Sequence, residues 1–156
     1  MDPFSIVVGS VGVIDVCARL VKYLREFEKA IAEIDQDIKD LLHHLDTVAL
    51  IVKSINDAFG SKVGRVPDKT ETDNSQVQQL WENASNVLHD CRCKMESLEV
   101  LVKEIKGKAR PRGPSKLDGF KKQLRRQAKE EEYRSIRSDL DNFLQLLQTI
   151  LQIIDL

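Results

Sequence analysis

The chain has 156 residues, enough for one domain that buries roughly 70% of the surface of its unfolded form without help from a disulfide or metal. Charged residues make up 31% and hydrophobic residues 42%, while Gly, Pro and aromatic residues are scarce, which favours long amphipathic helices over a sheet protein. The formal net charge of -1 excludes a global electrostatic attraction to nucleic acid.

Hydrophobic periodicity predicts four helices. Asp2 and Pro3 start the first, since Asp caps free N–H groups and Pro fits the first helical position. This helix is expected to run to about Glu28, with a break near Ala30. One continuous helix from the N-terminus to Phe59 is the rival prediction, because neither Gly nor Pro marks that break.

The second helix carries a heptad stripe over four heptads. The stripe consists of Ile31, Ile34, Ile38, Leu41, Leu45, Val48, Val52, Ile55 and Phe59. Gly60 is expected to end this helix, and Ser61 to Ser75 to form a loop.

The third helix has an apolar face of Val77, Leu80, Ala84, Val87, Cys91, Met95, Leu98, Leu101 and Ile105, widened by Trp81 and Leu88. Gly107 and three further Gly or Pro residues then break the chain. The fourth helix is expected to start near Ser115, and a phase slip in its stripe predicts a kink around Ala128 to Glu132. No segment alternates with period two. The sequence therefore predicts an all-α, up-down four-helix bundle over residues 1–156, with long helices and a kinked last helix.

The cysteines and histidines predict neither a metal site nor an active site. Three cysteines are an odd number without framework spacing, so free thiols and an intracellular compartment are expected. Cys91 and Cys93 cannot chelate one ion on a helix, because positions two apart point about 200° away from each other. The adjacent His43 and His44 diverge similarly and are expected at the surface or its boundary. Without a phosphate loop, a nucleophile elbow or a catalytic triad, no enzyme and no cofactor are expected.

The N-terminal apolar stretch from Phe4 to Ile14 is the main candidate for function. It lacks a basic n-region, so a cleaved signal is not expected, and Asp15 and Arg19 end it well short of the ~20 residues that span a bilayer. Its apolar residues spread almost all round the helix, more than one buried stripe needs. Gly9 and Gly12 each cost about 1 kcal/mol of helix propensity but permit close helix packing.

Three segments carry a family resemblance: MDPFSIVVGSVGVIDVCARLVKYL, IAEIDQDIKDLLHHLDTVALIVKSI and KEEEYRSIRSDLDNFLQLLQTIL. The first begins with Asp2-Pro3 and Phe4, followed by a helix of small and β-branched residues that contains Gly9 and Gly12. Over nearly its whole length the chain resembles the HeLo-like N-terminal domain of fungal STAND receptors, which are NLR-type proteins.

The resemblance implies a regulated, cell-death-inducing domain. In this family and its relatives, oligomerisation of a C-terminal receptor driven by nucleotide brings several helical bundles together on a membrane. The nucleotide-binding and repeat regions are missing here, so the chain is expected to be the effector part of a larger receptor. It is expected to be cytoplasmic at rest, and to self-associate and move to the plasma membrane on activation.

Two sets of residues follow as candidate membrane contacts. The residues expected to insert are Phe4, Ile6, Val7, Val8, Gly9, Val11, Gly12, Val13 and Ile14; a buried central helix is the alternative. The residues expected to meet anionic lipid, at ~1 kcal/mol each near the surface, are Lys106, Lys108, Arg110, Arg112, Lys116, Lys121 and Lys122. A solvated loop is the alternative for this basic cluster, and nucleic acid is a weaker one because Phe120 is its only aromatic residue.

Asp15 has two open interpretations. It either pairs with Arg19 four positions on, or lines a cation pathway in an assembled pore. For the whole chain, the hypothesis from a different class is a protein-interaction scaffold that does not touch lipid.

Overall fold

The computed structural model describes residues 4–31, 34–63, 71–109 and 117–154. These residues form five helices: α1 (Phe4–Ala30), α2 (Gln36–Val63), α3 (Glu71–Lys108), α4 (Phe120–Arg126) and α5 (Glu130–Ile154). The all-α prediction is confirmed for these ranges, in which the only strand-like contact is an isolated bridge between Ile31 and Leu117.

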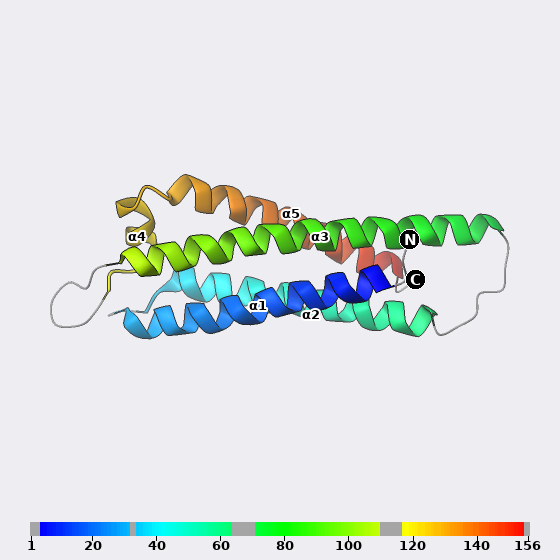
Figure 1. Ribbon diagram of the computed structural model, residues 1–156, viewed down its shortest axis with the longest axis horizontal. Coiled ribbons are helices and arrows are strands. Elements are labelled where there is room, and N and C mark those ends of the chain that lie inside the picture. Colours follow the sequence, from blue (N-terminus) through cyan, green and yellow to red (C-terminus); the bar gives the residue numbers. More distant parts are fainter. Residues whose placement is uncertain (1–3, 32–33, 64–70, 110–116, 155–156) are drawn as a thin grey trace.

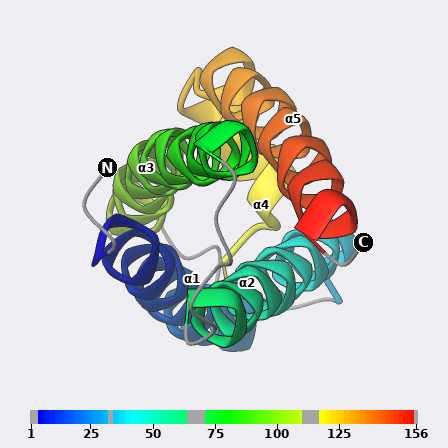
Figure 2. The ribbon, with the colours of Figure 1, turned by 90° about the vertical axis from the view of Figure 1, so that its right-hand side faces the viewer.

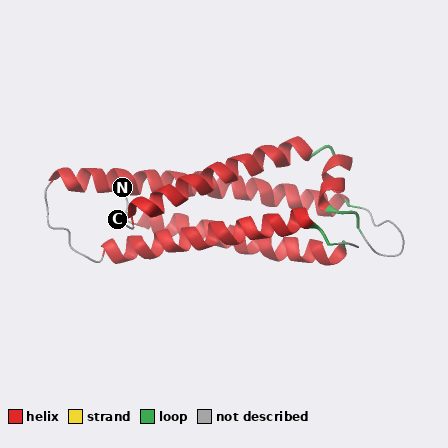
Figure 3. Cartoon of the chain, turned by 180° about the vertical axis from the view of Figure 1, so that it is seen from behind, coloured by secondary structure: helices red, strands yellow, loops and turns green. Residues whose placement is uncertain are grey.

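The four long helices lie along the long axis of the molecule, and the short α4 lies at one end (Figure 1). Seen end-on, α1 packs against α2 and α3, and α5 packs against the same two helices on the other side (Figure 2). The contacts Cys17–Met95 and Arg19–Glu99 join residues 78 and 80 positions apart, so α1 and α3 run in the same direction. The view from behind shows that α5 crosses the other helices at a slant (Figure 3).

Each long helix turns one apolar stripe inward. The largest completely buried side chains come from α1 to α4 and include Ile6, Leu20, Leu24, Phe27, Ile38, Leu41, Leu45, Ile55, Leu88, Met95, Leu98 and Phe120. The buried residues of α5 are Ile136, Leu140, Leu147, Ile150 and Ile154. Each such side chain contributes about 1.5–3 kcal/mol through its removal from water. The shared core therefore stabilises the arrangement of the long helices.

The helix boundaries correct several predictions. The break near Ala30 is confirmed, and the rival continuous helix is wrong. Asp35 caps α2, since its Oδ1 accepts a hydrogen bond of 3.1 Å from the Ile38 amide. Ile34 precedes this cap and is 79% exposed, so its place in the buried heptad stripe is wrong. Gly60 lies inside α2, which continues to Val63.

Both ends of the loop expected over residues 61–75 are helical instead. Residues 61–63 belong to α2 and residues 71–75 to α3, while the stretch between them lies outside the described residues. The expected start of the fourth helix near Ser115 also lies outside them, and α4 begins at Phe120.

The last helical region forms two helices instead of one kinked helix. Residues 127–129 leave the helical path between α4 and α5, and Ala128 has a φ of 55°, in the left-handed region. A non-glycine residue adopts this conformation at a cost of about 1 kcal/mol. The phase slip in the sequence therefore predicts the position of the interruption correctly. The interruption is a break between two helices and not a kink within one.

Candidate functional site

One face of α1 belongs to the core. Ile6 and Val13, both expected to insert into a membrane, are completely buried in this conformation. The same face continues with Val16, Cys17, Leu20, Leu24 and Phe27, all buried. Ile14 packs partly buried against this core, whereas the side chain of Phe4 lies outside the described residues. These positions are therefore core residues as long as α1 stays packed.

Gly9 and Gly12 lie where α1 approaches α3. A Cβ atom on Gly9 would come within 3.2 Å of the Leu88 Cβ, and one on Gly12 within 2.9 Å of the Arg92 Nη1. Both distances are shorter than an ordinary contact, but Arg92 Nη1 ends a flexible side chain that can move aside, whereas the Leu88 Cβ is fixed to the α3 backbone. Gly9 therefore permits the close packing of these parallel helices. The structure thus gives Gly9 a packing role that requires no membrane.

The opposite face of α1 is exposed along its whole length, and we call it the outward stripe. Its members are Val7, Val8, Val11, Asp15, Ala18, Lys22, Arg25, Glu26 and Lys29, which from Val8 to Arg25 follow one another at alternating steps of three and four residues. The three valines are 39%, 61% and 56% exposed. The three cations form no ion pair within the described parts of the chain. One helix face therefore presents apolar side chains in its first half and, in its second half, three cations beside the single carboxylate of Glu26.

Sequence reasoning found the valines but missed the cations of the outward stripe. The signal was present, because Val8, Asp15, Lys22 and Lys29 are each seven residues apart. A spacing of seven brings side chains to the same face of a helix. The basic cluster near the third loop is denser in sequence, so it is a more conspicuous signal than the widely spaced cations of α1.

Asp15 belongs to an ion-pair network between α1 and α3. Its carboxylate accepts a hydrogen bond from Arg19, which also donates to Glu99 at 3.0 Å. The expected pairing with Arg19 is confirmed. The hydrogen bond from Arg19 lowers the pKa of Glu99. With 62% of its side chain exposed, Asp15 gains little stability from this pair; its role in lining a pore stays a prediction.

Two lysines of the predicted basic cluster are occupied by contacts within the protein. Lys106 lies 3.8 Å from Glu26 and 4.6 Å from the centre of the Tyr23 ring. Lys108 lies 2.8 Å from Glu104. These two lysines therefore offer less free charge to a lipid than the sequence suggests. Three other expected contacts, Arg110, Arg112 and Lys116, lie outside the described residues.

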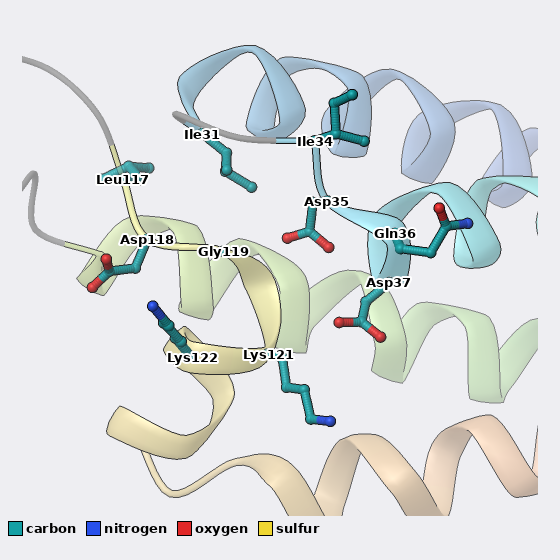
Figure 4. Close-up of a pocket in the computed structure, with 10 residues that line it drawn as sticks. All are labelled: Ile31, Ile34, Asp35, Gln36, Asp37, Leu117, Asp118, Gly119, Lys121 and Lys122. Atoms are coloured by element: carbon teal, nitrogen blue, oxygen red, sulfur yellow. The ribbon is translucent and has the colours of Figure 1, made fainter.

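Lys121 and Lys122 are exposed and lie beside a cleft at the α4 end of the molecule. The cleft has a volume of about 290 Å³ and is lined by residues 31, 34–37, 117–119, 121 and 122 (Figure 4). Asp37 and Asp118 also line it, so lysines and carboxylates share the same rim. This mixture gives the cleft no clear preference for an anionic group.

The cysteines lie as the helical spacing predicts. Cys91 is buried and Cys93 is exposed, so the two side chains point apart, and the thiols are free. Burial raises the pKa of both Cys17 and Cys91 to about 12. The Sγ of Cys93 lies 3.8 Å from Nε2 of His89. In the described ranges no three His, Cys, Asp or Glu side chains come together in a way that could hold a metal ion.

His44 contradicts the prediction for the histidine pair. His43 is exposed, but His44 is only 8% exposed between α2 and α5, with Nδ1 at 3.4 Å from an Asp141 oxygen. Its Nε2 has no hydrogen-bond partner within the described chain. Burial lowers the pKa of His44, and the positive charge of Arg137 lowers it further, because both disfavour the protonated ring. His44 is therefore a buried residue of the α2–α5 contact.

Among the described residues, no helix has both the length and the hydrophobicity required to cross a membrane. Comparisons with protein-family models, curated proteins and solved structures found no match for this chain. The site residues therefore have to be interpreted from their own geometry and chemistry.

Proposed function

We propose that this chain is the membrane-targeting, cell-death-inducing signalling domain of a larger fungal NLR-like receptor, activated by oligomerisation. The observation that carries the proposal is the outward stripe of α1. The proposal includes no catalytic step and no cofactor.

The outward stripe has the chemistry of a helix that lies on an anionic membrane. Val7, Val8 and Val11 offer apolar surface to the boundary between headgroups and acyl chains. Lys22, Arg25 and Lys29 follow on the same face, and each contributes about 1 kcal/mol near an anionic surface. A bundle that lies with α1 against the membrane therefore brings both groups into contact at once.

The buried face of α1 supports a second, activated step. Ile6 and Val13 can reach lipid only when α1 leaves α2 and α3. In this proposal the receptor gathers several copies at a membrane, and their combined contacts favour the release of α1. Binding through several linked copies raises the effective concentration of each one at the surface.

The fold and the location belong to the same proposal. The four long helices act as an up-down bundle in which α4 and α5 together take the place of the kinked last helix. The domain is cytoplasmic at rest and moves to the plasma membrane when the receptor oligomerises. Its partners are anionic lipids and other copies of itself.

The direct test is fusion of the domain to a neutral oligomerising protein, followed by measurement of cell death and of leakage from anionic vesicles. The proposal expects both to occur in the fusion and to be lost when residues 1–12 are deleted. A folded fusion that neither kills cells nor permeabilises vesicles would contradict it. The same fusion with residues 1–12 deleted is the matched control, provided that it retains its helical content.

A protein-interaction scaffold is the second candidate. The packing of Gly9 against Leu88 of α3 supports it, because this packing explains the glycine without a membrane. A scaffold would use the outward stripe to bind a protein. It would show no leakage and no affinity for protein-free anionic vesicles, whereas a membrane domain would bind them in a salt-sensitive manner.

A further inference from the structure

The short helix α4 closes the end of the molecule at which α1 ends and α2 begins (Figure 1). Phe120 is its main contact and is completely buried. The Phe120 ring meets Phe27 of α1 edge-on with 6.0 Å between the ring centres, and Tyr133 of α5 with 5.1 Å. Because α4 covers the aromatic end of the core, we call residues 117–129 the end plug.

One carboxylate ties the end plug to the rest of the chain. Asp35 is only 7% exposed, and its Oδ1 accepts a hydrogen bond from the Ile38 amide at the start of α2. Its Oδ2 accepts a hydrogen bond of 2.6 Å from the Phe120 amide at the start of α4. Figure 4 shows Asp35 between these two segments. The two oxygens of a single side chain therefore join helices that are 85 residues apart in sequence.

Glycine at position 119 allows this contact. A Cβ atom on Gly119 would lie 3.2 Å from Oδ2 of Asp35, which is tighter than an ordinary contact. Two further hydrogen bonds hold the ends of the end plug: the Leu117 amide donates to the Ala30 carbonyl at 2.9 Å, and Gln127 Nε2 donates to the Ile105 carbonyl at 3.0 Å.

Other features of the end plug oppose its closed position. Ala128 has a φ of 55°, a strained conformation for a residue with a side chain. Gln123 Nε2 and Gln127 Oε1 are buried without a hydrogen-bond partner in the described chain, which is unfavourable in a dry interior. Open clefts of about 290 and 310 Å³ border α4, so solvent reaches its flanks. The closed position thus depends on a few hydrogen bonds and on Phe120.

We propose that the end plug opens and closes while the long helices stay packed, and that Asp35 is its latch. Opening breaks the hydrogen bond from the Phe120 amide to Asp35 and exposes the aromatic rings of Phe27 and Tyr133. Proteins open locally in cooperative units whose stability is below that of the whole molecule, and the end plug has the properties of such a unit. This opening of the end plug does not require contact with a membrane.

Hydrogen exchange of the full chain tests the latch. In the unmodified protein the amides of residues 120–129 should exchange through an opening that is more frequent than global unfolding, as measured at the centre of α3. Asp35→Asn keeps the shape of the side chain but leaves one acceptor oxygen for two amide donors. It should speed exchange in residues 120–129 by ~10-fold or more and leave the α3 centre unchanged. Asp37→Asn is the matched control, because Asp37 is exposed and forms no hydrogen bond or ion pair in the described chain.

Ala128→Gly provides an independent test with the opposite sign. Glycine removes the strain at positive φ, so exchange in residues 120–129 should slow by about fivefold. This variant decides the matter if Asp35→Asn does not fold. Three results would overturn the proposal: exchange of the end plug only by global unfolding, equal acceleration in all helices of Asp35→Asn, or exchange in Ala128→Gly that is as fast as in the unmodified chain.

Discussion

Two negative charges on the outward stripe should weaken membrane binding at least about 20-fold without unfolding the protein. The perturbation is the double variant Val8→Glu, Val11→Glu. The two valines are 61% and 56% exposed, so folding buries less than half of each side chain. Complete burial of a valine side chain stabilises the folded state by about 1.5 kcal/mol. Loss of the buried fractions of both valines should therefore cost about 1.2 kcal/mol of folding stability. This cost is small beside the free energy of unfolding of a typical domain, which is roughly 5–15 kcal/mol.

The effect on membrane binding should be larger than the effect on folding. The exposed parts of the two valines are worth about 1.8 kcal/mol if lipid covers them, which corresponds to a roughly 20-fold weaker affinity when they are lost. Repulsion between two carboxylates and an anionic surface adds to this loss. Co-sedimentation with vesicles that contain phosphatidylserine measures the affinity, and thermal unfolding checks the fold.

The matched control is Leu50→Glu, Val100→Glu. Both residues are 65% exposed and lie on α2 and α3, so this variant adds the same two charges at positions outside the outward stripe. It should bind vesicles more tightly than the α1 variant. The reasoning is refuted if the α1 variant keeps its thermal transition and binds as well as the unmodified chain, or if the control loses as much affinity.

Three further predictions concern single residues. Gly9→Leu should destabilise the protein by about 1–3 kcal/mol in denaturant unfolding, because the new Cβ would come within 3.2 Å of the Leu88 Cβ, which is fixed to the α3 backbone and cannot swing away. Ala128→Gly should stabilise it by about 1 kcal/mol, because the relief of the positive φ is larger than the added freedom of the unfolded chain. The pKa of His44 is lowered in the folded state, so the unfolded chain takes up a proton at this residue at higher pH than the folded chain does. The free energy of unfolding should therefore decrease as the pH falls from about 7 to about 5. In His44→Gln this part of the decrease should be missing from thermal unfolding curves.

The helices themselves were predictable from sequence because their apolar residues repeat with the helical period. The heptad stripe of α2 from Ile38 to Phe59 is buried as predicted. Its first two members misled the prediction, since Ile31 and Ile34 keep the same spacing but precede the cap at Asp35. The capping signal was visible as an Asp three residues before Ile38, but the regular spacing outweighed it.

The order of the helices around the core and the state of His44 were not predictable in the same way. Periodicity shows which face of a helix is apolar but not which other helix covers it. The parallel contact of α1 with α3 therefore appears only in the structure. His44 lies between Leu41 and Val48 in the α2 stripe, and its burial follows from the position of α5, which the sequence does not specify.

The parallel pairing of α1 with α3 has a consequence for the synthesis of the chain. Gly9 packs against Leu88 and Cys17 lies against Met95, so the main partner of α1 is made some 78 residues later. At 5–20 residues per second, a ribosome needs roughly 4 to 16 s to make that stretch. During this time α1 can pair with α2 but still exposes the apolar surface destined for α3. The nascent chain therefore passes through a stage in which the α1–α2 hairpin exposes apolar surface. Binding of this surface to a chaperone or to a membrane would compete with folding.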